Sequence, residues 1–243
     1  MRLQFIGSGD AFGSGGRFNT CFHLTGAHTN ALIDCGASSL VALKKAGIER
    51  NAIDTILITH FHADHFGGIP FFVIDAQLVA KRTEPLRIAG PPGLPGWYER
   101  LFAATFPGER KLPFELTLQE VEIGKPNDVG NLRVTPFSVR HEERAGPCLA
   151  YRIEAEGKTV SYSGDTEWTD ALIEAARGAD LFVCECYMFE KVVRAHLSLS
   201  TLREKLPLIG AKRVILTHMS EDMLGRLGDV GCEAAADGAS IDF

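Results

Sequence analysis

A chain of 243 residues, 45% hydrophobic and 23% charged, has the composition of an ordinary globular protein. The formal net charge of −6 argues against non-specific binding to nucleic acid or anionic lipid. No apolar run approaches the roughly 20 residues that cross a bilayer, and the N-terminus lacks the apolar core of a signal peptide. We therefore expect a cytoplasmic protein that is not embedded in a membrane.

Short β-rich runs alternate with helical patterns through the first half of the chain. Helices are predicted for residues 38–46, 69–80 and 94–105. Strands are predicted for residues 2–7, 21–25, 31–34, 55–59 and 86–89. The strand at 55–59, "TILIT", is rich in β-branched residues and uninterrupted, which is typical of a strand buried on both faces.

The second half repeats this alternation. Strands are predicted for residues 115–122, 132–139, 148–154, 159–163 and 181–186, and helices for residues 170–177 and 199–209. A further strand, "RVILT", leads to His218, and the tail is expected to form a hairpin that turns at Asp237 and Gly238. Because no segment resembles a linker, we expect a single α/β domain over residues 1–243, built of two similar halves.

The segment "LITHFHADHFGG" concentrates residues that bind metal ions. Directly after the strand at 55–59 it places His60, His62, Asp64 and His65. Neutral imidazoles and carboxylates are the natural ligands of zinc and of neighbouring ions. A loop at the end of a strand can turn these side chains inward, so the segment indicates a metal site.

One loop cannot close two metal coordination shells, so the site requires ligands from elsewhere in the chain. His141, Asp165 and His218 have suitable side chains, and each follows a β-rich run. In open α/β sheets, ligands gather beyond the carboxyl ends of the strands. We therefore expect these three residues to meet the histidine loop at one edge of a sheet.

Taken in order, these motifs resemble those of the metallo-β-lactamase fold superfamily, whose fold is an α/β sandwich of four layers, αββα. The resemblance implies that one metal is held by His60, His62 and His141, and a second by Asp64, His65 and His218, with Asp165 bridging the two. Asp34, in "LIDCG", matches a family aspartate that supports the loop.

The resemblance also bears on the cofactor. Superfamily members with a redox di-iron centre typically carry glutamate at the position of His62. Histidine there favours two divalent ions of zinc, with manganese or iron as alternatives, and hydrolysis as the chemistry.

Three further segments resemble the ribonuclease Z-like branch: "FIGSGDAFG" with Arg17, "LRIAGPPG", and "AHLSLST". True tRNA-processing members carry a long basic arm, and no such insert is visible here. The resemblance therefore implies a phosphodiesterase of the arm-less kind, in which a metal-bound hydroxide attacks a small phosphodiester or nucleotide, cyclic ones included.

Other functions stay open. A ribonuclease Z-like RNA endonuclease and a hydrolase of lactones or thioesters use the same metals, and RNA is the less favoured substrate because the chain is acidic. A non-enzymatic scaffold of this fold is disfavoured, since such proteins usually lose metal ligands and this chain keeps all seven.

Two residues are candidates for catalytic roles. Asp64 is expected to orient the attacking water, and His196, which precedes the helix at 199–209, to protonate the leaving alkoxide. The alternative for His196 is a helix-entry residue that bonds its own loop. Cys184 and Cys186, on either side of Glu185 in a buried run, are expected to be packed thiols rather than ligands.

The helix at 69–80, "IPFFVIDAQLVA", is apolar on nearly all sides, more than an outer helix with one wet face should be. In the branch that this chain resembles, the corresponding helix often lies at a homodimer interface. A homodimer is therefore expected, with burial of this helix inside its own subunit as the alternative.

Overall fold

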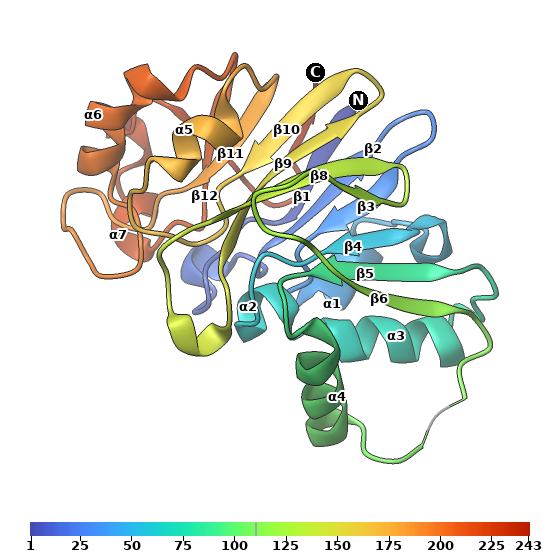
Figure 1. Ribbon diagram of the computed structural model, residues 1–243. Helices are drawn as coiled ribbons and strands as arrows, with labels where there is room; N and C mark the ends of the chain where they lie inside the picture. The colour runs from blue at the N-terminus through green and yellow to red at the C-terminus, as the bar shows by residue number, and fades with distance from the viewer. Residues whose placement is uncertain (110) are drawn as a thin grey trace.

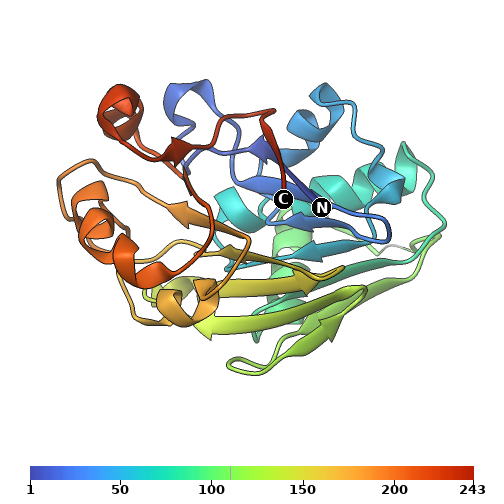
Figure 2. The same ribbon diagram turned by 90° about the horizontal axis from the view of Figure 1, so that it is seen from above.

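The computed structural model describes residues 1–109 and 111–243, and within them the chain forms two sheets of seven strands each. The sheets lie face to face, and helices cover the outer face of each (Figure 1). The view from above shows the four layers of the sandwich and the two chain ends side by side (Figure 2). The predicted αββα arrangement is confirmed.

The first sheet holds most of the N-terminal half. It mixes antiparallel pairs at one side with a parallel run from β3 to β6. Its strands, in spatial order, are β14 (Ser240–Asp242), β1 (Arg2–Gly7), β2 (Cys21–Thr25), β3 (Asn30–Ile33), β4 (Thr55–Leu57), β5 (Leu86–Gly90) and β6 (Leu116–Glu120).

The second sheet has the same plan, with a parallel run from β10 to β13 and antiparallel strands at the other side. Its strands, in spatial order, are β13 (Glu233–Ala234), β12 (Val214–Thr217), β11 (Leu181–Glu185), β10 (Lys158–Tyr162), β9 (Leu149–Ala155), β8 (Leu132–Ser138) and β7 (Asn127–Val129).

Three apolar clusters fill the spaces between the layers. The central cluster joins the inner faces of the two sheets and includes Phe22, Tyr151 and Tyr162, all fully buried. The second packs the first sheet against α1 (Ser39–Lys45), α3 (Ile69–Leu78) and α4 (Leu94–Thr105). The third packs the second sheet against α5 (Ala171–Ala176) and α6 (Leu199–Ile209).

Short helical turns lie at the strand ends. They are α2 (Ala63–Phe66), α7 (Glu221–Leu224), η1 (Ser14–Gly16), η2 (Arg50–Ala52), η3 (Glu143–Ala145) and η4 (Leu227–Asp229). The first of these, α2, carries part of the histidine motif directly after β4. The predicted helices and strands occur with boundary shifts of a few residues, while β7 was not predicted.

The predicted hairpin at the tail is wrong. A turn does form at Asp237 and Gly238, but β13 pairs with β12 in the second sheet and β14 pairs with β1 in the first. The side chain of Asp237 accepts hydrogen bonds from Ser8 and from the backbone N–H of Phe18. These bonds hold the turn against the loop after β1, so the tail crosses between the sheets instead of folding back on itself.

Among the described residues, no helix combines the length and the apolar character needed to cross a membrane.

Candidate metal centre

Four connections meet where the carboxyl ends of strands from both sheets adjoin. His60 and His62 follow β4, His141 follows β8, Asp165 follows β10 and His218 follows β12. This is the meeting at one edge that the sequence predicts. All seven predicted ligands fall into two groups whose donor atoms lie within 4.8 Å of one another.

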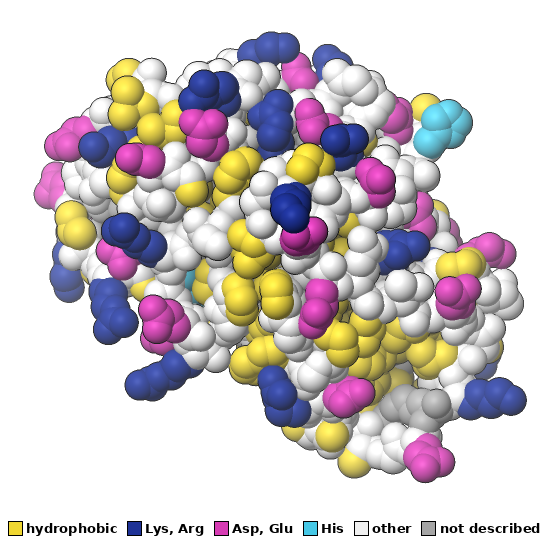
Figure 3. Space-filling view, viewed as in Figure 1, with side chains coloured by type: hydrophobic (Ala, Val, Ile, Leu, Met, Phe, Trp, Pro, Cys, Tyr) yellow, Lys and Arg dark blue, Asp and Glu magenta, His cyan; other side chains and the backbone are white. Residues whose placement is uncertain are grey.

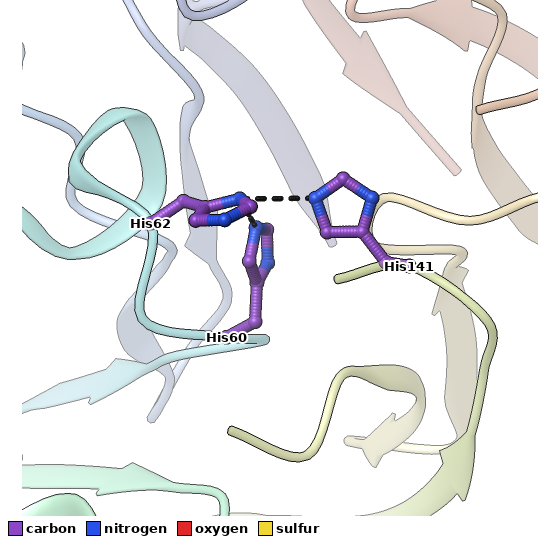
Figure 4. A group of neighbouring side chains, drawn as sticks. All are labelled: His60, His62 and His141. Carbon is purple, nitrogen blue, oxygen red and sulfur yellow. Dashed lines mark hydrogen bonds between the residues drawn. The ribbon is translucent and has the colours of Figure 1, made fainter. Parts of the chain in front are cut away.

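The first group is the histidine trio His60, His62 and His141, whose rings point toward one another (Figure 4). His62 Nδ1 lies 3.1 Å from His60 Nε2 and 3.0 Å from His141 Nε2. Three nitrogens at the corners of a tetrahedron with zinc–nitrogen bonds of about 2.0–2.1 Å would be about 3.3–3.4 Å apart. The trio therefore has nearly the spacing that a shared ion requires.

Hydrogen bonds on the far side of the His60 and His141 rings fix which nitrogen of each faces inward. His141 Nδ1 donates to the carbonyl of Ala195 at 2.8 Å, and His60 Nδ1 lies 3.1 Å from Thr59 Oγ1. Thr59 Oγ1 in turn donates to Asp34. With Nδ1 engaged as a donor, the rings of His60 and His141 present the lone pair of Nε2 to the trio, the arrangement typical of metal-binding histidines. His62 instead presents Nδ1.

The second group contains Asp64, His65, Asp165 and His218, and all four are buried. Asp165 Oδ2 lies 3.2 Å from both His65 Nε2 and His218 Nε2. The same oxygen is 3.8 Å from His141 Nε2, which belongs to the histidine trio. Asp165 thus lies between the two groups.

Several atoms of this group have no hydrogen-bond partner although they are buried. They are His65 Nε2, Asp165 Oδ1 and His218 Nδ1. A buried polar atom without a partner costs about 1–3 kcal/mol, and a protein rarely keeps such atoms together without a use for them. All three are imidazole nitrogens or carboxylate oxygens, the donor types that zinc accepts. The residues present therefore fit a pair of metal ions.

The pKa values of the site histidines depend on burial and on the carboxylates beside each ring. Burial lowers the pKa of His60, His62 and His141, which keeps these rings neutral as ligands must be. Burial would also lower the pKa of His65, but the carboxylates of Asp165, Asp64 and Asp34 outweigh it and raise that pKa well above its usual value.

The pKa of His218 is also raised. Burial would lower it, but the charge of Asp165 and the hydrogen bond with Asp64 outweigh the effect of burial. Burial would raise the pKa of Asp64 and of Asp165, but the neighbouring histidines outweigh it, and both pKa values are lowered. The carboxylates of the second group therefore carry negative charge that a cation must balance. Protons on the two imidazoles of the group can do this, and so can a divalent metal ion.

The side chain of Asp34 supports the loop that carries the histidine motif. Asp34 accepts hydrogen bonds from the backbone N–H of Thr59 and, at 2.7 Å, from His65 Nδ1. It thereby holds His65 directly and His60 through Thr59, the supporting role that the resemblance implies. Asp34 and His218 both have positive φ, at 59° and 55°, a conformation that is rare outside glycine and is often found at functional sites.

Gly36 shows how closely the parts of this loop approach. A Cβ atom at Gly36 would lie 2.1 Å from the carbonyl oxygen of Asp64. Any side chain there would push the α2 turn away from its support, so glycine is required at this position.

His196 lies beside the two groups, close enough to be a further ligand but also held by other contacts. Its ring stacks on that of His218, with centroids 5.4 Å apart and an angle of 16° between the planes. Its Nδ1 lies 3.1 Å from Glu185 Oε1. Burial would lower its pKa, but Glu185 outweighs it and raises the pKa of His196 to about 9, so the ring carries a proton at neutral pH.

Glu185 was not predicted as a site residue. It is fully buried at the end of β11 and accepts hydrogen bonds from Thr166 N, Leu197 N and His196. A signal was present, because an acidic residue inside the apolar run "LFVCEC" must find a partner when it is buried. The flanking Cys184 and Cys186 pack in the third apolar cluster, as predicted.

Comparisons with known proteins show which family the chain belongs to. Residues 1–233 match the model of the family described as Anti-Pycsar protein Apyc1. The ribonuclease Z of Agathobacter rectalis is 29% identical over 262 residues, covering 86% of this chain and 84% of the relative.

Two solved structures show the same fold. YhfI, a metallo-beta-lactamase fold protein from Bacillus subtilis, has a TM-score of 0.80 at 20% identity, covering 99% of this chain and 98% of that one. The short form of human tRNase Z has a TM-score of 0.80 at 23% identity, covering 100% and 99%. Because the family model spans nearly the whole chain, the protein belongs to the Anti-Pycsar protein Apyc1 family and is a metal-dependent phosphodiesterase of the metallo-β-lactamase fold.

Proposed function

We propose that this protein hydrolyses a cyclic nucleotide to a nucleoside monophosphate. The observation that carries the proposal is the pair of donor groups joined by Asp165, in a chain of the Apyc1 family. That family acts on cyclic nucleotides, which are small phosphodiesters of the kind that a compact site without an RNA-binding arm can accept.

Two zinc ions are the proposed cofactor. His60, His62 and His141 would hold one, and Asp64, His65 and His218 the other, with Asp165 between them. When bound, such a pair lowers the pKa of a water molecule and stabilises negative charge on the phosphoryl oxygens. Imidazole and carboxylate donors suit zinc, while manganese and iron are the alternatives that the same donors accept.

Two residues of the chain have proposed roles in the reaction. Asp64 is 7% exposed and belongs to the second donor group, so its carboxylate can accept a hydrogen bond from the attacking water and orient it. His196 carries its proton beside the site and can donate it to the leaving ribose oxygen. Protonation matters because an alkoxide is a poor leaving group.

A ribonuclease Z-like RNA endonuclease is the second candidate, and the similarity to ribonuclease Z favours it. Against it, the aligned stretch of 262 residues exceeds the whole length of this 243-residue chain, so that relative contains residues that this chain lacks. The net charge of −6 also disfavours a polyanion as substrate. Lactones and thioesters remain substrates that the same metal site could attack.

The first test combines metal analysis with a substrate screen. Protein purified without chelator should contain close to two transition-metal ions per chain, and it should hydrolyse cyclic nucleotides and simple aryl phosphodiesters. Removal of the ions with a chelator should abolish both activities, and zinc should restore them. Turnover of a tRNA precursor, a lactone or a thioester without turnover of cyclic nucleotides would assign the function to that alternative.

We also propose that the protein forms a homodimer through α3. Phe71, Leu78 and the adjacent Val79 are 44%, 56% and 62% exposed, and apolar side chains gather over the region of β6 and α3 (Figure 3). Large exposed apolar patches commonly mark interaction surfaces. Light scattering at micromolar concentration should give twice the chain mass of 26.4 kDa. A mass of one chain would instead show that α3 stays exposed in a monomer.

A further inference from the structure

Tyr187 forms part of the wall of the metal centre, although the reaction proposed above does not use it. Its ring centroid lies 4.7 Å from that of His196 and 6.1 Å from that of His218. The tyrosine follows β11 and stands two residues after Glu185, the carboxylate that holds His196. The aromatic wall thus extends from His218 through His196 to Tyr187.

The backbone of Tyr187 is firmly held. Its N–H donates to the carbonyl of Leu197, and its own carbonyl accepts hydrogen bonds from the backbone and the side chain of Ser220. The next residue, Met188, forms a bridge with Ser198, in the segment that carries His196. Tyr187 and His196 therefore keep a fixed position relative to each other.

The side chain of Tyr187, by contrast, retains an unused polar group. The ring is partly exposed, and among the described residues none forms a hydrogen bond with the hydroxyl. A phenol hydroxyl is a hydrogen-bond donor at neutral pH. An aromatic face with a polar tip, held rigidly at a partly exposed position, is a common form of ligand contact.

From this position we infer that Tyr187 binds the nucleoside part of the substrate, its ring packing against the sugar or base and its hydroxyl donating a hydrogen bond. This inference rests on the proposed function. In a cyclic nucleotide both ester oxygens belong to the same ribose. The nucleoside must therefore lie next to whichever oxygen His196 protonates, and Tyr187 is the neighbour of His196.

The test distinguishes binding of the nucleoside from binding of the phosphate. With hydrolysis of bis(p-nitrophenyl) phosphate as the assay, inhibition constants are measured for a nucleoside 5′-monophosphate and for inorganic phosphate, using metal-loaded full-length protein. The variants are Tyr187→Ala and Tyr187→Phe. Equal metal content and an unchanged circular dichroism spectrum show that each variant is folded and loaded.

Tyr187→Ala should weaken inhibition by the nucleotide about 5- to 100-fold, the range found when an aromatic residue is removed from beneath a base. Tyr187→Phe keeps the ring and should weaken it about 2- to 10-fold, the loss of one hydrogen bond. Inhibition by inorganic phosphate should be unchanged in both. For cyclic nucleotides as substrates, KM should rise by the same factors, with a smaller effect on kcat.

Three results would overturn the inference: an unchanged nucleotide inhibition constant in Tyr187→Ala, equal losses for nucleotide and phosphate, or wild-type protein that binds the nucleotide no more tightly than phosphate. A fall in kcat without a change in nucleotide binding would show that Tyr187 only supports His196. If wild-type protein cleaves the aryl ester but no cyclic nucleotide, the proposed substrate fails, and the inhibition constants still decide the role of Tyr187.

Discussion

His62→Ala is expected to abolish hydrolysis of both cyclic nucleotides and aryl phosphodiesters. His62 Nδ1 is the atom that faces both His60 Nε2 and His141 Nε2. Its removal therefore leaves the histidine trio with two nitrogen ligands instead of three. Loss of an outer partner of a metal ligand typically costs 10- to 100-fold in activity, and loss of a ligand itself should cost more than about 100-fold. Elemental analysis should find fewer ions per chain than in the wild-type protein.

This variant is a fair test because His62 is partly exposed and lies outside the three apolar clusters. Its thermal unfolding in the presence of chelator should therefore match that of the wild-type protein under the same conditions. His28→Ala is the matched control, since His28 is an exposed histidine in the turn between β2 and β3. The control should keep full activity and metal content. A fully active His62→Ala protein with two ions would remove this residue from the ligand set.

His196→Ala is expected to lower kcat steeply for substrates with an alkyl leaving group and far less for those that release p-nitrophenolate. General-acid catalysis typically contributes roughly 10²- to 10⁴-fold, and p-nitrophenolate needs no proton because it is a stable anion. Metal content should not change if the seven predicted ligands hold the ions without His196. The measurement is kcat for a cyclic nucleotide beside kcat for an aryl phosphodiester.

Glu185→Gln provides the companion variant. Glu185 raises the pKa of His196, so the amide should leave this imidazole less often protonated at neutral pH. In this variant kcat should again fall more for alkyl leaving groups than for p-nitrophenolate, but by a smaller factor than in His196→Ala. Equal losses for both substrates, or loss of metal in His196→Ala, would instead place His196 among the ligands, consistent with its membership of a group with His141 and Asp165.

The elements of the fold could be predicted because their signals are local. Helical periodicity marks α4 and α6, whose bounds match the prediction, and Ser198 caps α6. β-Branched runs mark β4 and β12. The strand β7 could not be recognised, since "NDV" has only three residues and gains its stability from pairing with β8. Short polar strands of this kind depend on a neighbour that the local sequence does not reveal.

At the tail, too, the local sequence could not show which strands pair. Asp237 and Gly238 carry the chemistry of a turn, and a turn is what they form. Which strands the turn connects depends on hydrogen bonds from Ser8 and Phe18, more than 200 residues away along the chain. Local turn chemistry fixes the conformation of a few residues and does not select the partners of the strands on either side.

By itself the sequence determined the chemical class of the site, because imidazoles and carboxylates at this spacing after strands have few other uses. The tertiary structure alone decided which ring nitrogens face inward, since that depends on Asp34, Ala195 and Thr59 behind the rings. It also decided that Glu185 holds His196 and that Tyr187 stands beside it. Such pairings arise when strand ends from two sheets meet, and the distance between them in space is independent of their distance along the chain.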